Sequence, residues 1–370
     1  MKCGLKIFLF GVLFISKISA QGTWIQKTSM PCAPREGAIG FSIGNKGYIG
    51  AGLLSSELKA KDFWEFDPTS NLWTQKADIP TGRRCEAIGF SIGSKGYVGF
   101  GANNGEYFND FLEYDPTLNQ WISETNTGIS ARYGSVSFVI GNKGYVTNGF
   151  KEYTINGCTT NETWEFDQGS NSWSQKANFP GIARSHSSAF RIGGTGYVGL
   201  GIDSTGTCLQ DFWKYDPISN QWTQISNFPG QGRAYAISFA VNGFGFIGNG
   251  FNFLVSLSDF YSYDPINDTW NISVPYGGGL WSECATFNIG QKVYVGTGTS
   301  LNGNTWSLTN ELWEFSSTTS VNELEPKIKI AVYPNPCTSG FLLGIASEKE
   351  VSLLITNELG QKIFQEKFVH

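Results

Sequence analysis

Short runs in which apolar residues alternate with small or polar ones recur along this chain with a nearly fixed period. One period, from Trp73 to Trp121, contains AIGFSI, a turn at GSKG, the run YVGFG and the run FLEYDP, and the next period opens with a further run. Alternation with a period of two predicts half-buried strands, so we expect four strands in each period. An anchor tryptophan marks the periods at intervals of 49, 48, 52, 49 and 48 residues: Trp24, Trp73, Trp121, Trp173, Trp222 and Trp270.

A period near fifty residues predicts a repeat architecture, and four-stranded units repeated around an axis form a β-propeller. The ends of the repeated region indicate how the ring closes. The first period starts with a fourth strand at Trp24, and the last one ends near Trp313 without a fourth strand. We therefore predict an all-β, six-bladed propeller whose last blade combines both ends of the domain, because closure removes exposed sheet edges.

The glycines, aromatic residues and tryptophans at fixed spacing resemble kelch repeats, of the kind found in galactose oxidase, over residues 21–317. The sequence departs from the kelch pattern in two ways: the usual adjacent glycines are spaced as G-x-G, and Thr147 replaces the first of them in the third period. The resemblance implies a kelch-type propeller. It does not extend to the copper of galactose oxidase, which needs two histidines with tyrosines, whereas the mature chain offers only His186 and His370. We expect no cofactor and no metal.

The N-terminal residues have the pattern of a secretory signal peptide. Lysines precede an apolar run from Ile7 to Ile15, and small residues follow up to Ala20, so we predict a signal peptide at residues 1–20. The run is shorter than the about 20 residues that span a bilayer. We expect a soluble mature protein, secreted or on the outer cell surface, with no membrane span.

The mature chain is acidic. Without the three lysines of residues 1–20, 23 of the 26 basic residues remain against 31 acidic residues, so the formal net charge is 23 − 31 = −8. Neutralisation of phosphates dominates the affinity of proteins for nucleic acids, so nucleic acid is not an expected partner.

The repeat ends after Phe315, and residues 318–327 are predicted to be a polar linker. Residues 328–370 resemble part of the C-terminal sorting domain of the type IX secretion system, a small β-sandwich found in Bacteroidota. The segments that carry this resemblance are VYPNP at 332–336 and NELGQ at 357–361. The strands that normally follow are missing, so we expect a truncated domain. The resemblance implies the type IX secretion machinery as a partner, with release from or attachment to the cell surface.

Six cysteines follow residue 20, and their spacing is not that of a metal site. Disulfides are common in exported proteins. Cys158 and Cys208 lie in equivalent loops of neighbouring blades and are the first candidate pair, with free buried thiols as the alternative.

Side chains that the repeat does not require are the candidates for ligand binding. Ten of the twelve tryptophans occupy repeated positions, and the other two are Trp281 and Trp306. Trp281 stands six residues before Phe287, where the other blades have an arginine, and Trp306 lies in a lengthened loop. Trp281 and the five arginines are expected to circle the mouth of the central channel: Arg35, Arg84, Arg132, Arg184 and Arg233.

Two interpretations of the arginines remain open. Arginines repeated in five blades commonly satisfy carbonyl groups or acids between blades. Alternatively, they form an electropositive rim that recognises carboxylates or sugar hydroxyls through bidentate hydrogen bonds. Two positions after each arginine or Trp281, the residue type changes from blade to blade. A binding site needs such variation, whereas a scaffold does not. The six residues are Gly37, Glu86, Gly134, His186, Tyr235 and Glu283.

The loops between second and third strands vary in length and share a face with these positions, and variable loops on a rigid scaffold commonly bind. We predict a binding module that recognises a glycan or an extracellular protein, with the ligand over the sixth blade near Trp281 and Trp306. Two alternatives remain. One is a carbohydrate-acting enzyme of mutarotase or epimerase type that uses Glu86, His186 and Glu283 as acids or bases. The other is a structural adhesin without a small ligand.

Overall fold

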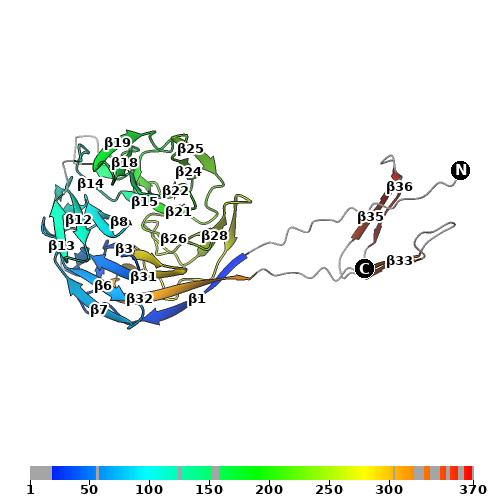
Figure 1. Cartoon of the computed structure of the whole chain (residues 1–370), viewed down its shortest axis with the longest axis horizontal. Coiled ribbons are helices and arrows are strands. Elements are labelled where there is room, and N and C mark those ends of the chain that lie inside the picture. The colour runs from blue at the N-terminus through cyan, green and yellow to red at the C-terminus, as the bar shows by residue number, and fades with distance from the viewer. Residues whose placement is uncertain are drawn as a thin grey trace. The chain divides into compact units, whose positions relative to one another are not determined.

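The computed structural model describes residues 19–55, 58–123, 127–151, 158–302, 305–320, 329–333, 342–346, 351–356 and 362–368. The chain divides into two units, one of residues 20–319 and one that combines residues 1–19 with 320–370. The first unit holds six four-stranded antiparallel sheets arranged around a central axis (Figure 1). The predicted all-β, six-bladed propeller is confirmed. In the part of the chain that the structure describes, no helix is long and apolar enough to cross a membrane.

The first three blades follow one another along the chain, each running from its innermost to its outermost strand. Blade 1 comprises β3 (Ile39–Ile43), β4 (Lys46–Gly50), β6 (Phe63–Asp67) and β7 (Leu72–Lys76); blade 2 comprises β8 (Ile88–Ile92), β9 (Lys95–Gly99), β12 (Phe111–Asp115) and β13 (Gln120–Ser123); blade 3 comprises β15 (Val136–Ile140), β16 (Lys143–Thr147), β18 (Thr163–Asp167) and β19 (Ser172–Lys176).

The next two blades repeat this order. Blade 4 comprises β21 (Ser188–Ile192), β22 (Thr195–Gly199), β24 (Phe212–Asp216) and β25 (Gln221–Ile225), and blade 5 comprises β26 (Ile237–Val241), β27 (Phe244–Gly248), β28 (Phe260–Asp264) and β29 (Thr269–Ile272). Pairs of two-residue strands flank three of the blades: β2 (Arg35–Glu36) with β5 (Leu53–Leu54), β14 (Arg132–Tyr133) with β17 (Phe150–Lys151), and β20 (Arg184–Ser185) with β23 (Ile202–Asp203). In blade 2, β10 (Ala102–Asn103) pairs with β11 (Glu106–Tyr107).

Blade 6 closes the ring with both ends of the domain. Its sheet has the order β1-β32-β31-β30, so the N-terminal strand β1 (Ser19–Lys27) supplies the outermost strand. The other strands are β30 (Ala285–Ile289), β31 (Lys292–Asn302) and β32 (Thr305–Ser320), and Figure 1 shows β1 beside β32. Trp24 of β1 lies with its ring centroid 4.8 Å from those of both Tyr276 and Phe315. The predicted mode of closure is confirmed.

Neighbouring blades are held together by phenylalanine rings that pack on glycines. A Cβ atom on Gly47 would lie 2.0 Å from the ring of Phe287 in the preceding blade, so a larger residue does not fit there. Four more second-strand glycines meet the first-strand phenylalanine of the preceding blade in the same way: Gly96, Gly144, Gly196 and Gly245. This close approach explains why glycine recurs in the second strand.

The turn before each anchor tryptophan fixes the outer edge of a blade. Asn119 adopts φ +52°, and its Oδ1 accepts the N–H of Ala77 from the preceding blade at 2.9 Å. Trp121 then donates its indole N–H to the carbonyl of Ala77 at 2.8 Å. The residues at this position of the turn all adopt left-handed backbone: Asn71, Asn119, Asn171, Asn220 and Asp268.

In the second unit, the described strands form two antiparallel pairs, β33 (Lys329–Tyr333) with β34 (Leu342–Ala346) and β35 (Val351–Thr356) with β36 (Lys362–Phe368). The NELGQ segment, most of VYPNP and the signal-peptide residues 1–18 lie outside the described residues. The sorting domain and the signal peptide therefore stay predictions.

Cys208 is a free thiol, so the candidate disulfide between Cys158 and Cys208 is not formed. Each of the two cysteines is held in its own blade by backbone pairing: the carbonyl of Cys158 accepts the N–H of Lys151, and Cys208 pairs with Ile202. The alternative of free thiols is observed for Cys208, Cys32, Cys85 and Cys284.

Candidate functional site

Each of the five repeated arginines forms an ion pair inside its own blade. Arg184 is fully buried; it donates from Nη1 to Oδ1 of Asp211 at 2.6 Å and from Nη2 to Oδ2 at 2.8 Å. Its remaining donors reach the carbonyls of Leu200 and Ile182. We call these pairs the arginine stations: Arg35–Asp62, Arg84–Asp110, Arg132–Glu162, Arg184–Asp211 and Arg233–Asp259.

The stations decide between the two interpretations of the arginines that the sequence leaves open. All five guanidinium groups are 0–1% exposed, and burial without a partner would be costly, so each is matched by a carboxylate. The stations also join blades, because the N–H of Gly149 in blade 3 donates to the carbonyl of Arg184 in blade 4 at 2.9 Å. The interpretation of the arginines as groups that satisfy acids and carbonyls is the one that this geometry supports.

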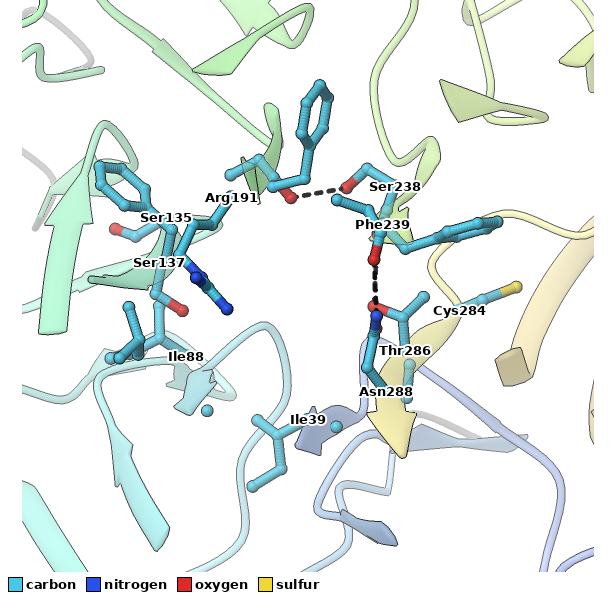
Figure 2. Close-up of a pocket in the computed structure, with 18 of the residues that line it drawn as sticks. Ile39, Ile88, Ser135, Ser137, Arg191, Ser238, Phe239, Cys284, Thr286 and Asn288 are labelled. Atoms are coloured by element: carbon cyan, nitrogen blue, oxygen red, sulfur yellow. Dashed lines mark hydrogen bonds between the residues drawn. The ribbon is translucent and has the colours of Figure 1, made fainter. Parts of the chain in front are cut away.

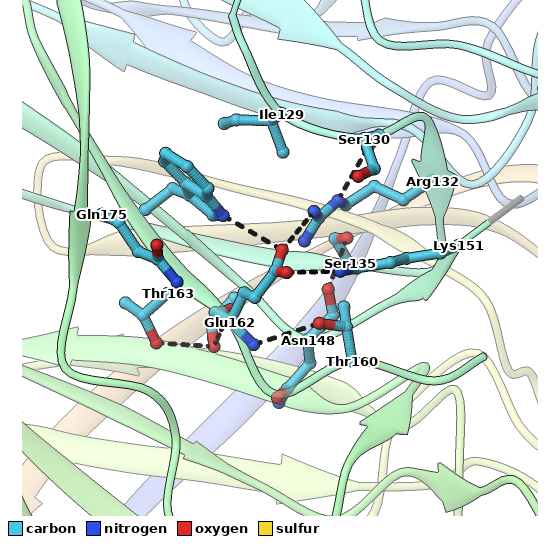
Figure 3. Close-up of polar contacts among 12 residues, drawn as sticks. Ile129, Ser130, Arg132, Ser135, Asn148, Lys151, Thr160, Glu162, Thr163 and Gln175 are labelled. Atoms are coloured by element: carbon cyan, nitrogen blue, oxygen red, sulfur yellow. Dashed lines mark hydrogen bonds and ion pairs between the residues drawn. The ribbon is translucent and has the colours of Figure 1, made fainter.

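The station of blade 3 differs from the other four. Glu162 replaces aspartate, and its Oε2 accepts a bond from Arg132 Nη2 at 2.7 Å while its Oε1 pairs with Lys151 (Figure 3). Nη1 of Arg132 has no hydrogen-bond partner among the described residues. Burial lowers the pKa of Arg132, and the bond to Glu162 opposes this only in part. Blade 3 is also the blade in which Thr147 replaces glycine; its hydroxyl bonds the carbonyl of Glu162 at 3.0 Å.

Six residues at the inner start of the blades form a closed ring of backbone hydrogen bonds, which we call the axial ring. The N–H of each donates to the carbonyl of its equivalent in the preceding blade at 2.7–3.2 Å, and the N–H of Gly37 returns to Glu283. All six have φ between +53° and +61°, a region that residues with a side chain rarely adopt. Such strain persists where the surrounding structure enforces it, and it is often found at functional sites. The members are Gly37, Glu86, Gly134, His186, Tyr235 and Glu283.

The side chains of the axial ring enclose a pocket of about 140 Å³, the axial pocket. His186 Nε2 lies 2.8 Å from Oε2 of Glu86, and the ring of Tyr235 is tilted against the imidazole with the two centroids 4.2 Å apart. A Cβ on Gly134 would lie 2.5 Å from His186 Nε2, so glycine leaves the space that the imidazole occupies. The structure thus brings together the variable positions that the sequence singled out.

Below the axial ring, the first strands enclose a central channel of about 380 Å³ (Figure 2). Its wall is polar and joins blades: Asn288 donates to the carbonyl of Ala240 at 2.6 Å, and Ser238 donates to Ala189 at 3.1 Å. Arg191 extends from β21 toward the open centre of the channel (Figure 2). The channel is therefore lined mainly by small and hydroxyl side chains.

The two tryptophans outside the repeat differ in exposure. Trp281 is partly buried against the core shared by blades 5 and 6, whereas Trp306 in β32 is 56% exposed. Among the described residues, the ring contact of Trp306 is with Phe251, whereas Trp281 packs on the core. The prediction of a joint ligand site stays a prediction, and only Trp306 presents a largely free ring.

Trp306 belongs to a larger exposed surface that the sequence analysis did not identify. Phe253 is 47%, Leu254 81% and Val255 51% exposed in the loop after β27. Phe251 lies beneath them, with its ring 5.3 Å from Phe253 and 5.6 Å from Trp306. We call the surface formed by Phe253, Leu254, Val255 and Trp306 the apolar ridge.

The loop that carries the apolar ridge is held in place by polar contacts. The Oδ1 atom of Asn252 accepts the backbone N–H groups of Leu254 and Val255 at 3.1 and 2.9 Å, and its Nδ2 donates to Gln231 at 2.8 Å. The hydroxyl of Ser256 accepts the N–H of Leu301 from β31, which ties the loop to blade 6. The one available signal in the sequence was the run FNFLV, four apolar residues in five at a loop position.

Comparisons with known proteins agree with this fold. Residues 78–234 match the family model described as the KLHDC2/KLHL20/DRC7 Kelch-repeats domain. Within the propeller, the match to a kelch-repeat model extends over residues 78–234. A solved structure titled "Structure of YjhT" matches with a TM-score of 0.65 and 17% identity over 77% of this chain and 96% of its own. At that identity the likeness of the propeller to the solved structure is one of fold alone. A search of the curated proteins found none that matches the chain.

Proposed function

We propose that this chain is an exported interaction module that binds a protein partner through the apolar ridge of its kelch propeller. The observation that carries the proposal is the ridge itself, in which four large apolar side chains between 47% and 81% exposed lie on one ordered surface. Contiguous exposed apolar side chains usually mark interaction sites, and aromatic residues contribute strongly to binding energy there. Kelch propellers are in general protein-interaction modules, which supports the same conclusion.

A protein suits the ridge better than a glycan does. Sugars stack on flat aromatic faces and need hydrogen-bonding groups beside them. Half of the ridge is aliphatic, and the side-chain groups of Asn252 that lie next to it already bond the loop and Gln231. Leu254 and Val255 match the apolar side chains of a polypeptide. Export is supported by the signal-peptide pattern of residues 1–20 and by the sorting-domain resemblance of residues 328–370.

Selection of displayed random peptides on the full chain tests this proposal. Peptides selected on the unmodified chain should bind Leu254→Ser and Trp306→Ala about tenfold or more weakly, because each substitution removes a central apolar contact. Ile266→Ser is the matched control: Ile266 is 89% exposed in the turn between β28 and β29, at the other end of blade 5. The selected peptides should bind Ile266→Ser as tightly as they bind the unmodified chain.

Three results would contradict the proposal. Peptides that bind both ridge variants as tightly as the unmodified chain would place the interaction elsewhere. A glycan array with ridge-dependent hits and no peptide binder would favour the glycan interpretation. Turnover in a panel of sugars monitored by NMR, abolished by Glu86→Gln, would favour the enzyme.

A further inference from the structure

The axial pocket gathers acidic groups that basic side chains do not balance. Glu86 and Glu283 line it, and Glu36 lies next to Gly37 at its edge, near enough to interact electrostatically with both. Among the described residues, the only ion pair that any of the three forms is that of Glu86 with His186. Lys59 is near enough to act on the Cys85 thiol, but its Nζ donates to Oδ1 of Asn104 at 2.8 Å.

Glu283 is the least compensated member of the set. Its side chain is enclosed by protein apart from the surface that faces the pocket, and its Oε2 lies 3.4 Å from where a Cβ on Gly37 would be. No hydrogen bond to its carboxylate is found in the described part of the chain. Burial raises the pKa of Glu283 well above its usual range, and repulsion from Glu86 and Glu36 adds to this effect. A carboxylate in such a place is costly unless a cation reaches it.

The same carboxylates also raise the pKa values of two neighbouring groups, Glu36 and Tyr235. Burial raises the pKa of Glu36, and Glu86 adds to the rise, although a hydrogen bond from Thr299 opposes it. The pKa of Tyr235 is raised by burial and then by Glu86 and Glu283. The hydroxyl of Tyr235 and the carboxylates together offer acceptors around one small volume.

A metal ion does not fit these groups as they stand. Within the described residues, no three carboxylate, histidine or cysteine side chains converge closely enough to hold a metal ion. Oxygen ligands must approach Ca²⁺ to about 2.3–2.6 Å. The carboxylates of the axial ring instead surround a pocket of about 140 Å³. That space suits a larger cation that can donate several hydrogen bonds outward.

We propose that the axial pocket binds an organic cation, the ammonium or guanidinium group of an amine or of a lysine or arginine side chain. Glu86 and Glu283 accept its hydrogen bonds, and the aromatic ring of Tyr235 lines the same pocket. Charge-assisted hydrogen bonds of this kind are the strong ones, and aromatic faces add attraction for a cation. The pocket opens on the same end of the blades as the apolar ridge, because both lie where a first strand starts and a second strand ends.

The proposal also predicts proton release. The raised pKa of Glu283 means that its carboxyl group retains a proton to higher pH than usual, and the cation favours the charged form. Binding should therefore expel a proton, and the affinity should rise with pH. Calorimetric titrations in two buffers of different ionisation enthalpy measure this release directly.

N-acetyl-arginine amide, tested on the full chain, is a suitable probe, with N-acetyl-citrulline amide as its neutral counterpart of nearly the same shape. The chain contains two histidines, His186 and His370, so the imidazole NMR signals report where the probe binds. The arginine probe should shift the His186 signals in a saturable way and leave those of His370 unchanged. The citrulline probe should bind about tenfold or more weakly, since it lacks the charge.

Two variants and one control complete the test. Glu283→Gln and Glu86→Gln should each weaken the arginine probe, with Glu283→Gln also abolishing proton release, while Leu254→Ser should bind it normally. The ridge control separates failure of this site from failure of the proposed protein-binding function. Binding of a short arginine peptide without binding of the small probe would assign the cation to a polypeptide partner. Equal binding of the arginine and citrulline probes, or binding of Ca²⁺ alone, would overturn the proposal.

Discussion

In five of the six blades the arginine station and the axial residue lie only two positions apart, yet their charges are compensated in opposite ways. At a station, a buried guanidinium meets a carboxylate and backbone carbonyls, as in Arg184 with Asp211. In the axial ring, Glu283 has neither a counter-ion nor a hydrogen-bond donor among the described residues. The stations repeat in five blades, whereas the axial residues change from blade to blade. Residues that repeat and whose charges are paired, as at the stations, therefore belong to the scaffold. Residues that vary and whose charges are unpaired, as in the axial ring, indicate a ligand site.

Tryptophans give the largest expected contrast between scaffold and site. Trp222 belongs to the repeat, bonds the carbonyl of Ala177 at 3.0 Å and packs on Phe179, so Trp222→Ala should lower the free energy of unfolding by about 3–5 kcal/mol. Trp306→Ala should change it by less than about 0.5 kcal/mol, because Trp306 is mostly exposed. Urea denaturation of both variants measures the difference. A large loss for Trp306→Ala would make that residue part of the scaffold.

The next contrast compares two arginines of blade 4. Arg184→Met leaves Asp211 without its partner and should cost about 3 kcal/mol of unfolding free energy. Arg191 is exposed in the channel and donates from Nη1 to the carbonyl of Gly193, so Arg191→Met should cost less than about 0.5 kcal/mol. Similar losses in the two variants, measured by denaturant titration, would remove the distinction between station and channel.

Blade 3 allows a finer test of the stations. Arg132 has one unsatisfied donor, and Glu162 keeps Lys151 as a partner when Arg132 is replaced. Arg132→Met should therefore be less destabilising than Arg184→Met by about 1–2 kcal/mol. If Arg132→Met and Arg184→Met lose the same unfolding free energy, the additional contacts of Glu162 do not compensate for the loss of Arg132. Thermal unfolding of both variants under one condition gives the comparison.

The sequence predicted the propeller because each blade repeats the same packing problem. The spacing of the tryptophans and the split blade at Trp24 both follow from local periodicity. The sequence also identified the axial positions, since variation at one place in a repeat is visible without a structure. It left the role of the arginines open, because their burial depends on the carboxylate that each meets, about 26–30 residues further along the chain.

The apolar ridge could not be predicted for a different reason. Phe251 and Leu254 lie in the same apolar run, but one is 9% and the other 81% exposed. The difference depends on Asn252, whose side chain accepts the backbone N–H of Leu254 and holds the loop in its conformation. The N–H of Leu301 in β31 of the next blade donates to Ser256 and ties the loop to that blade. Such contacts between a loop and its neighbour leave no periodic signal in the sequence.

The most direct test of the unbalanced axial charge is the pH dependence of the unfolding free energy of Glu283→Gln. Because the pKa of Glu283 is raised in the folded state, the folded chain holds a proton that the unfolded chain releases above about pH 4.5, and stability falls as the pH rises. Glutamine does not titrate. The variant and the unmodified chain should therefore be similarly stable at pH 4, and the variant should be more stable by about 1 kcal/mol at pH 8. A variant that is less stable than the unmodified chain at both pH values would show that Glu283 is a balanced scaffold residue, as Asp211 is, and would contradict this account.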